Sequence, residues 1–259
     1  MDLGISGRKA IVCGSSRGLG RACAISLAHA GCTVIVNGMD AERLQATADE
    51  IAQMTNAQII PVAGDVTTHE GQQRLLDACP QPDILVTNAG GPPFADFRQI
   101  DREAMLKGVT ANMVTPIEMI QRTVDGMVQR EFGCIVNITS VSVKMPVLGL
   151  DLSSGARAGL TAFLAGVSRS VAHANVTINN LLPGFIDTDR FKTGVAANAK
   201  ALGQSEAEMR IMREQQVPAK RIGRPDEFGE ACAFLCSSQA GYITGQNLLL
   251  DGGLHNSAF

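Results

Sequence analysis

A glycine-rich segment near the start of the chain has the residue types and spacing that suit phosphate binding. The sequence CGSSRGLG places Gly14, Gly18 and Gly20 between a short apolar run and a helical pattern. Glycine permits a tight turn and a close backbone approach to a pyrophosphate, which the N-terminus of the next helix attracts. The pattern also occurs in ordinary turns between a strand and a helix, so alone it favours a dinucleotide site without establishing one.

Asn112 and Pro116 form a second candidate, four residues apart in a helical stretch. Proline has no N–H, so the Asn112 carbonyl loses its partner at position i+4. A carbonyl freed inside a helix can hold a water molecule. The alternative interpretation is a simple proline kink.

The elements that must position these residues follow from the hydrophobic pattern. Apolar, β-branched runs predict strands over residues 9–13, 32–37, 57–62, 83–87, 133–139, 176–182 and 246–250. Amphipathic periodicity predicts helices over residues 18–30, 41–54, 68–79, 101–130, 153–172 and 225–237. Several strands are almost wholly apolar, as expected when helices cover both faces of a parallel sheet. The alternation predicts a single α/β domain over residues 1–259, with a doubly wound parallel sheet of about seven strands.

Residues 189–217 interrupt this alternation with a long, helix-prone segment, which we interpret as a substrate lid. Its apolar residues suggest a partly apolar pocket: Phe191, Val195, Leu202, Met209 and Met212. Four cations could meet an acidic group or only solvent: Arg190, Lys192, Arg210 and Arg213.

Composition limits the possible partners. The net charge of −3 and the lack of a basic block argue against a nucleic acid or a membrane surface as partner. The N-terminus has no apolar signal-peptide core, and no run is long enough to span a membrane. The seven cysteines are scattered, and Cys232 and Cys236 lie in apolar sequence that favours core packing over metal binding. We therefore expect a cytoplasmic protein with reduced thiols and no metal.

Several motifs then follow one another in a fixed order. They are GDV at 64–66, NAG at 88–90, NITS at 137–140, PGFIDTD at 183–189, RIGRPDEFGEACAFLCS at 221–237 and YITGQNLLLDGG at 242–253. In this order the chain resembles the short-chain dehydrogenase/reductase family nearly end to end, with the pattern of its 3-oxoacyl-ACP-reductase-like members. The resemblance implies a Rossmann fold that binds a nicotinamide dinucleotide. It places the cofactor on Gly14, Ser16, Arg17, Gly18, Leu19, Gly20, Asn37, Asp65, Val66, Asn88, Ala89, Gly90, Arg157, Pro183, Gly184, Ile186 and Thr188.

The resemblance also implies a catalytic group, and here the chain departs from the family. Asn112 corresponds to the asparagine that anchors a relay water, and Ser140 to the serine that orients the substrate carbonyl. Ser153 and Arg157 occupy the places of the family's tyrosine and lysine, thirteen and seventeen residues after Ser140. A serine hydroxyl is a much weaker acid than a phenol, and arginine cannot relay a proton by ionising. Both are therefore site residues with altered roles.

Other residues could supply the proton. Lys144 lies one short loop after Ser140 and could point toward the substrate, or it could be an ordinary exposed lysine. Asp151 is a weaker candidate. Tyr242 is the only tyrosine, and its segment is usually structural in the family, so we do not expect it to replace the missing phenol.

The end of the second strand favours NADP(H) over NAD(H). An acidic residue there would bind the adenosine ribose and repel a 2′-phosphate, but the chain has Asn37 and Gly38. Arg17 could pair with the phosphate. Two observations weigh against this preference. Arg17 could be an ordinary solvated charge in a loop, and Met39 lies near a position where NADP-binding relatives often have a basic residue.

Three interpretations remain open. The first is an oxidoreductase for a carbonyl or alcohol substrate, with Ser153 and a water chain, or Lys144, as proton donor. The second is a reductase of a conjugated C=C bond in an enoyl or dienoyl thioester, since the 2,4-dienoyl-CoA reductases of this family also have serine at the tyrosine position. The third is a dinucleotide-binding protein without turnover.

The resemblance also suggests self-association. In the family, the helices over 101–130 and 153–172 pack against another subunit, and the second is rich in Ser, Gly and Ala here. A homodimer or homotetramer is therefore expected by resemblance, although close packing on the chain's own sheet would explain the same residues.

Overall fold

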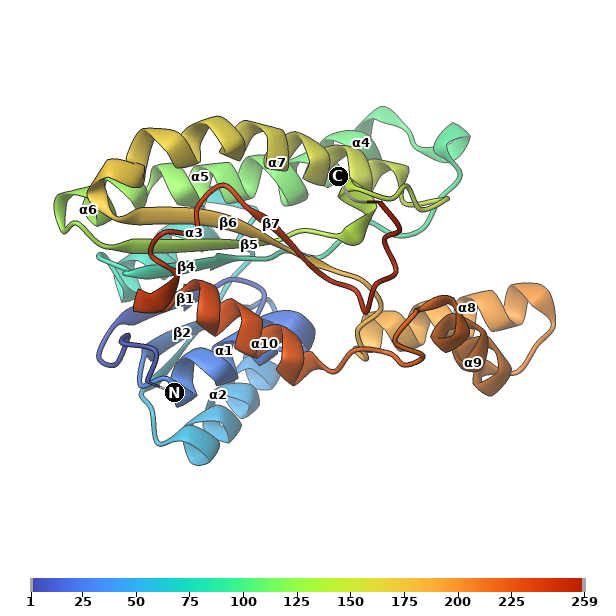
Figure 1. The fold of residues 1–259 in the computed structure, drawn as a ribbon, viewed down its shortest axis with the longest axis horizontal. Coiled ribbons are helices and arrows are strands. Elements are labelled where there is room, and N and C mark those ends of the chain that lie inside the picture. The colour runs from blue at the N-terminus through green and yellow to red at the C-terminus, as the bar shows by residue number, and fades with distance from the viewer. Residues whose placement is uncertain (1, 258–259) are drawn as a thin grey trace.

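A seven-stranded parallel sheet forms the centre of the molecule in the computed structural model, which describes residues 2–257 (Figure 1). The strand order is β3-β2-β1-β4-β5-β6-β7, and all neighbouring strands pair in parallel. The chain moves from β1 to one edge and then returns to place β4 on the other side of β1. In open α/β sheets, ligands bind at the carboxyl ends of the strands beside such a reversal. The predicted doubly wound α/β fold is confirmed.

The secondary structure has the following bounds. The strands are β1 Lys9–Val12, β2 Thr33–Gly38, β3 Ile59–Ala63, β4 Ile84–Thr87, β5 Gly133–Ile138, β6 Val176–Pro183 and β7 Asn247–Leu250. The helices are α1 Gly18–His29, α2 Ala41–Thr55, α3 His69–Ala78, α4 Arg102–Val109, α5 Thr115–Gln121, α6 Val124–Gln129, α7 Asp151–Val171, α8 Asp189–Leu202, α9 Glu206–Gln216 and α10 Pro225–Leu235. A π-helical turn, Thr110–Val114, joins α4 to α5.

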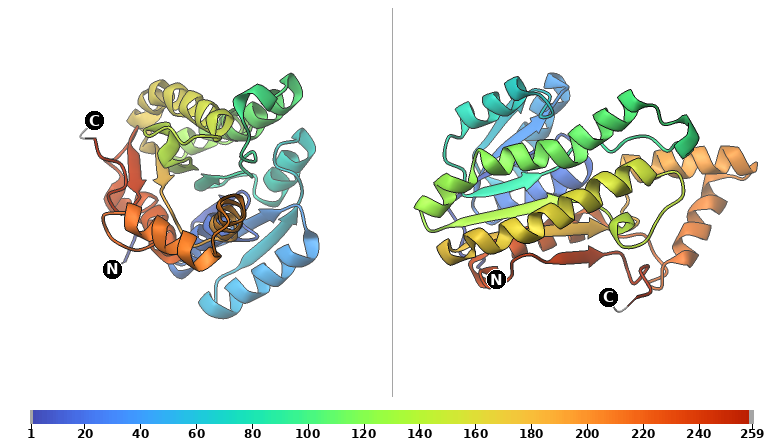
Figure 2. Two further views of the ribbon diagram at one scale, coloured as in Figure 1. Left: turned by 90° about the vertical axis from the view of Figure 1, so that its right-hand side faces the viewer. Right: turned by 90° about the horizontal axis from the view of Figure 1, so that it is seen from above.

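Helices cover both faces of the sheet, as Figures 1 and 2 show. Alternate residues of each central strand face opposite layers. Val12 and Val86 contribute to the core beneath α1, α2 and α10, whereas Ile11 and Leu85 contribute to the core beneath α3, α5 and α7. This two-sided burial explains why the strands are continuously apolar instead of alternating. Cys232 and Cys236 lie buried in the first of these cores, as the sequence predicts.

The stretch 101–130 is not the single helix that its periodicity predicts. It divides into α4, the π-helical turn, α5 and α6. Pro116 cannot donate a backbone hydrogen bond, so it breaks the regular i+4 ladder at Asn112. The bonding widens there, and the Thr115 N–H donates to the carbonyl of Thr110, five residues earlier. Such π-turns occur frequently at functional sites.

The segment 189–217 forms two helices that stand away from the sheet (Figure 1). Thr188 caps α8 by accepting from the Phe191 N–H, and Ser205 with Glu208 forms a capping box at the start of α9. Val195, Ala199 and Met209 form a small core of their own between the two helices. Within residues 2–257, no helix is both long and apolar enough to cross a membrane.

Candidate active site

The glycine-rich turn after β1 has a backbone that only glycine adopts readily. Gly14 and Gly18 have positive φ angles of 56° and 60°. A Cβ at Gly20 would lie 2.4 Å from the Gly14 carbonyl oxygen, which no real side chain could tolerate. Glycine therefore lets the turn fold tightly against the start of α1, the geometry that a pyrophosphate-binding turn requires.

Two asparagines hold this turn from opposite sides. The Gly14 N–H donates to Asn37 Oδ1 at 3.1 Å, and Asn88 Nδ2 donates to the Gly14 carbonyl at 3.0 Å. Asn37 is fully buried, and its Nδ2 also donates to the carbonyls of Val62 and Gly64. The side chain of Asn37 is thus engaged on both sides, and it braces the turn without facing solvent.

The N-terminus of α1 is open to an anion. Its N-cap residue, Arg17, makes no side-chain capping bond, and the first turn has no acidic residue. The first N–H groups of a helix have no intrahelical partner and carry a partial positive charge. Arg17 is exposed and lies 3.9 Å from Asp189 at the start of α8. Beside it, Ser16 and Leu19 are half-buried, and the Ser16 carbonyl accepts from Thr47.

The remaining predicted cofactor residues lie at or just beyond the carboxyl ends of the strands. Asp65 is exposed and accepts from both the N–H and the hydroxyl of Thr67, whereas Val66 is buried. Ala89 is half-buried, and Gly90 faces open space. On the other side, Pro183 ends β6, Gly184 lies against Asp251, Ile186 is buried, and Thr188 caps α8.

The predicted catalytic residues converge at the end of β5. Arg157 Nε donates to Ser153 Oγ at 3.4 Å, and its Nη1 donates to the carbonyl of Ile138, the last residue of β5. Ser140 follows two residues later, and its Oγ accepts from the Ser142 N–H at 3.1 Å. Ser153 and Arg157 are buried on the first two turns of α7. The fold therefore joins the serine–arginine pair to the strand end that carries Ser140.

Burial changes the electrostatics of the arginine. Desolvation, and next the positive charge of Arg190, lower the pKa of Arg157 to about 10. The guanidinium thus stays charged at neutral pH. It holds a fixed positive charge beside the Ser153 hydroxyl.

Asn112 lies buried in the π-turn, against which α7 packs. Its Nδ2 donates to the Gly108 carbonyl at 3.2 Å, but its Oδ1 is buried without a hydrogen-bond partner within the described residues. A buried acceptor of this kind usually binds an ordered water. The sequence pointed to the main chain of Asn112, whereas the structure adds an open acceptor on its side chain.

The other proton-donor candidates are differently placed. Lys144 is exposed at the end of the short 3₁₀ turn after Ser140, and Asp151 is exposed at the start of α7. Tyr242 is fully exposed, in the loop before β7. Of these candidates, only Ser153 is buried against a charged partner.

A buried polar ladder beneath the site was not predicted. Thr87 at the end of β4 donates to Asn137 Oδ1 at 2.6 Å, and Asn137 Nδ2 donates to the Asn179 carbonyl at 3.3 Å. The ladder ties β4, β5 and β6 together just below the strand ends. Asn137 within the otherwise apolar strand β5 was the available signal, because a buried amide must find partners. Within residues 2–257, no cluster of three or more metal-ligating side chains occurs.

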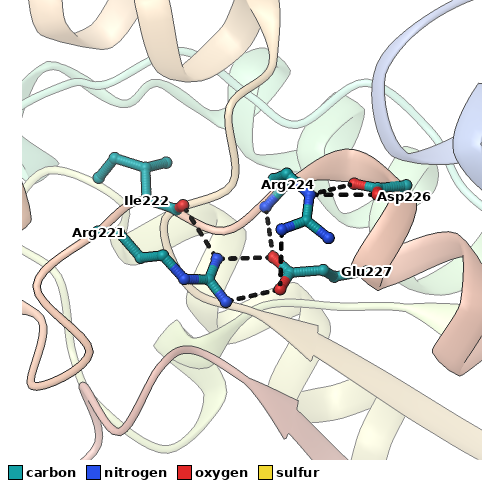
Figure 3. A network of polar contacts seen from close by, with 5 residues as sticks. All are labelled: Arg221, Ile222, Arg224, Asp226 and Glu227. Carbon is teal, nitrogen blue, oxygen red and sulfur yellow. Dashed lines mark hydrogen bonds and ion pairs between the residues drawn. The ribbon is translucent and has the colours of Figure 1, made fainter.

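The chain before α8 and the chain after α9 are hydrogen-bonded to each other, so the segment 189–217 is closed by backbone bonds. The Gly223 N–H donates to the Phe185 carbonyl and the Asp187 N–H to the Gly223 carbonyl, both at 2.9 Å. Beside them, Nη1 and Nη2 of the Arg221 guanidinium donate to Glu227, at 2.8 and 2.6 Å (Figure 3). Glu227 also accepts from the Arg224 N–H and so caps α10.

We expect Glu227→Gln to lower the free energy of unfolding, by an amount that depends on pH. The Arg221 guanidinium and the Arg224 N–H lower the pKa of Glu227 to about 2. Because the folded pKa lies below the unfolded value, the stabilisation is complete above about pH 5 and is lost as pH falls toward 2. The variant should lose about 1 kcal/mol of unfolding free energy at pH 7, since exposed pairs are screened.

Urea unfolding at pH 7, 4 and 2.5 checks this, with the gap between wild type and variant closing in acid. Asp226→Asn, which removes the carboxylate paired with the Arg224 side chain at 3.0 Å, is the control and should change stability less. A gap that does not depend on pH would show that charge is not the cause.

Comparison with known proteins supports the inference from the site. The family model described as "Enoyl-(Acyl carrier protein) reductase" matches residues 14–255. A 3-oxoacyl-(acyl-carrier-protein) reductase of Aquifex aeolicus is 33% identical, over 98% of this chain and 100% of that protein. The NADPH-dependent reductase BacG of Bacillus subtilis is 32% identical, over 96% of this chain and 98% of that protein.

A solved structure agrees throughout the fold. The L-sorbose reductase of Gluconobacter frateurii, complexed with NADPH and L-sorbose, superposes with a TM-score of 0.94 at 26% identity. The match covers 99% of this chain and 100% of that one. With its parallel seven-stranded sheet, its glycine turn and these relatives, the chain belongs to the short-chain dehydrogenase/reductase family of oxidoreductases.

Proposed function

We propose that the protein is an NADP(H)-dependent oxidoreductase that transfers a hydride between the nicotinamide and a carbonyl or alcohol substrate. The observation that carries the proposal is the Arg157 guanidinium, which links Ser153 Oγ to the carbonyl end of β5, next to Ser140. This arrangement puts two hydroxyl donors and a fixed positive charge at one strand end. Such groups stabilise negative charge that develops on a substrate oxygen.

The residues around the glycine turn fit a dinucleotide. Gly14 and Gly18 give the turn its positive φ angles, Gly20 packs against the Gly14 carbonyl, and the uncapped N-terminus of α1 attracts phosphates. NADP(H) is supported over NAD(H) because no carboxylate is free at the end of β2. Asp40, the first acid after that strand, accepts from the Arg43 N–H and lies 3.5 Å from the Arg43 guanidinium. Bound there, the cofactor would supply the hydride.

Ser140 would orient the reacting carbonyl. Its Oγ accepts from the Ser142 N–H, so its own hydrogen remains available to donate to a substrate oxygen. The Ser142 bond fixes the direction of the hydroxyl before the substrate arrives. Preorganisation of this kind is the main source of electrostatic stabilisation in a site.

Ser153 would donate the proton. Its Oγ accepts from Arg157 Nε, which leaves the Ser153 hydrogen free. A serine hydroxyl is a weak acid, but a guanidinium beside it favours the ionised form. Arg157 itself stays charged, so the proton must be replaced from water. The buried Asn112 Oδ1 in the adjacent π-turn is a suitable acceptor to hold that water.

The proposal extends to the segment 189–217 and to self-association. We infer that α8 and α9 form the lid over the substrate. The chain before α8 follows directly from the end of β6, and backbone bonds to Gly223 hold it to the chain after α9. A homodimer or homotetramer is supported by exposed apolar side chains on α4 and α7, namely Met105, Leu106 and Phe163.

The deciding experiment is a turnover assay with NADPH and with NADH. Ketones, 3-oxoacyl thioesters and enoyl thioesters are offered in separate panels, and cofactor oxidation is followed. We expect oxidation of NADPH with a carbonyl compound and tighter binding of NADPH than of NADH. Turnover with enoyl thioesters alone would favour C=C reduction instead, and tight NADPH binding without turnover on any panel would favour a non-catalytic protein.

A further inference from the structure

Arg190, in the first turn of α8, turns back from the lid onto the body of the protein. Its Nη1 donates to the Gly91 carbonyl at 3.1 Å and its Nη2 to the Pro92 carbonyl at 3.0 Å. A Cβ built on Gly91 would lie only 2.9 Å from Nη2, so the guanidinium lies directly against this loop. Gly91 and Pro92 follow the segment 88–90, just beyond the end of β4.

The other three cations of the segment behave differently. Arg210 and Lys192 both lie near Asp187, at 3.0 and 3.9 Å. Arg213 donates to Gln216 on its own helix and lies over the Phe185 ring. Arg190 alone among the four contacts the loop beside the candidate active site. The residue type was visible in the sequence, but its direction was not.

Arg190 and Arg157 form a pair of positive charges without an acidic partner. Within residues 2–257, no carboxylate lies within 4.0 Å of either guanidinium. The two acids that precede Arg190 in the sequence are engaged elsewhere, Asp189 near Arg17 and Asp187 with Arg210. The two side chains contact the ends of neighbouring strands, Arg157 at the Ile138 carbonyl of β5 and Arg190 at the Gly91 carbonyl just after β4. Desolvation lowers the pKa of both guanidinium groups.

An uncompensated pair of this kind suits an anion. Arg157 is a buried charge without a counter-charge, which costs free energy that a bound anion would recover, whereas Arg190 is exposed and accessible to a ligand. A guanidinium has five N–H donors in a planar fork, and Arg190 uses two nitrogens on backbone carbonyls while N–H groups remain for a ligand. The fork matches a carboxylate or a phosphate group.

The position favours an anion on the substrate over the phosphates of a dinucleotide. The phosphate cradle is the glycine turn, which Asn88 contacts through the Gly14 carbonyl. Arg190 contacts Gly91 and Pro92, three and four residues after Asn88, where the chain that follows β4 enters the loop 91–100. Arg157 contacts the end of β5 beside Ser140. The two cations therefore flank the strand ends where the reacting carbonyl would lie.

We propose that Arg190, together with Arg157, selects a carbonyl substrate that carries a carboxylate group. This inference rests on the proposed function, because it assigns the substrate class of the same site. It makes Arg190 the group that binds the carboxylate, with Arg157 adding to the positive field from the end of β5.

The test compares keto acids with their neutral methyl esters. The probes are pyruvate, acetoacetate and levulinate, which place the carboxylate at increasing distance from the ketone, each beside its ester. Their binding to the NADPH complex is measured by calorimetry, and their KM and kcat wherever turnover occurs. We expect at least one acid to bind more tightly than its ester. Arg190→Gln should weaken the binding of that keto acid about 10- to 100-fold and the binding of its ester less than about twofold, because the lost bonds are charge-assisted.

Lys200→Gln is the matched control. It removes the same charge from the same helix, but at an exposed site in the last turn of α8. It should leave the discrimination between acid and ester unchanged. Binding of NADPH alone to Arg190→Gln is measured separately and should stay within about twofold of wild type.

Three results would overturn the proposal. The first is that no acid of the panel binds more tightly than its ester. The second is that Arg190→Gln weakens the binding of acids and esters equally. The third is that Arg190→Gln weakens the binding of NADPH instead. The second would make Arg190 a brace for the loop 91–100, and the third would assign it to the cofactor phosphates. Because calorimetry reports binding without turnover, these results are distinct from failure of the turnover assay.

Discussion

Ser153→Ala is expected to lower kcat about 100- to 10,000-fold, the range that a lost general acid costs. The Ser153 hydroxyl is buried, accepts from Arg157 Nε at 3.4 Å and retains its own hydrogen to donate. Alanine removes that hydrogen without adding bulk. The Kd for NADPH should change little, because Arg157 keeps its bond to the Ile138 carbonyl. Stopped-flow reduction of the best carbonyl substrate, together with NADPH fluorescence titration, measures both quantities.

The neighbouring serine provides a matched control. Ser154 lies on the same helix, but its hydroxyl donates to the Leu150 carbonyl at 2.8 Å, so Ser154→Ala should change kcat less than about threefold. Lys144→Ala tests the other candidate donor. Because Lys144 is exposed, we expect this variant to keep nearly the wild-type kcat. Loss of activity in Lys144→Ala with full activity in Ser153→Ala would assign the proton to the lysine.

Ser140→Ala is expected to lower kcat/KM about 100- to 1,000-fold, the cost of one preorganised donor to a developing negative charge. The Ser142 N–H holds Ser140 Oγ at 3.1 Å, so the hydroxyl is already aimed when a substrate binds. The cofactor cradle lies on other elements, and the Kd for NADPH should therefore be unchanged. Steady-state kinetics with one carbonyl substrate and NADPH titration test these two expectations.

Two further variants sharpen the result. Ser140→Thr keeps a hydroxyl at the same atom and should retain more activity than Ser140→Ala. Ser170→Ala removes an exposed hydroxyl near the end of α7 that donates only to the Val167 carbonyl, and it should behave as wild type. Wild-type kcat/KM in Ser140→Ala would mean that another group orients the carbonyl.

Much of the fold and part of the candidate site follow from short stretches of sequence. Apolar runs and helical periodicity predicted the parallel sheet, because burial on both faces requires continuous apolar strands. The glycine turn was predictable because its positive φ angles and the close approach at Gly20 exclude other residues. The resemblance to the family, with thirteen and seventeen residues from Ser140 to Ser153 and Arg157, was sufficient to expect these residues in one site, and the structure joins Ser153 and Arg157 at the end of β5.

The sequence was less informative about direction and partners. The periodicity of 101–130 predicted one helix, because it registers apolar residues and not the missing N–H of Pro116. Asn37 was read as a cofactor contact at the end of a strand. In the structure its amide is engaged with Gly14, Val62 and Gly64, since β2 lies between the glycine turn and β3.

The sequence by itself determined the class of fold, the glycine turn and the family, because hydrophobic periodicity and ordered motifs can be recognised without knowing which residues are in contact. It also predicted that Ser153 and Arg157 occupy the places of the family's tyrosine and lysine. Only the tertiary structure decided that Arg157 reaches the carbonyl of Ile138, nineteen residues away, and that Arg190 reaches Gly91, ninety-nine residues away. Contacts of this length depend on strand register and helix packing, which no local pattern encodes. The contacts that set the positions of Arg157 and Arg190 therefore exist only in the folded chain.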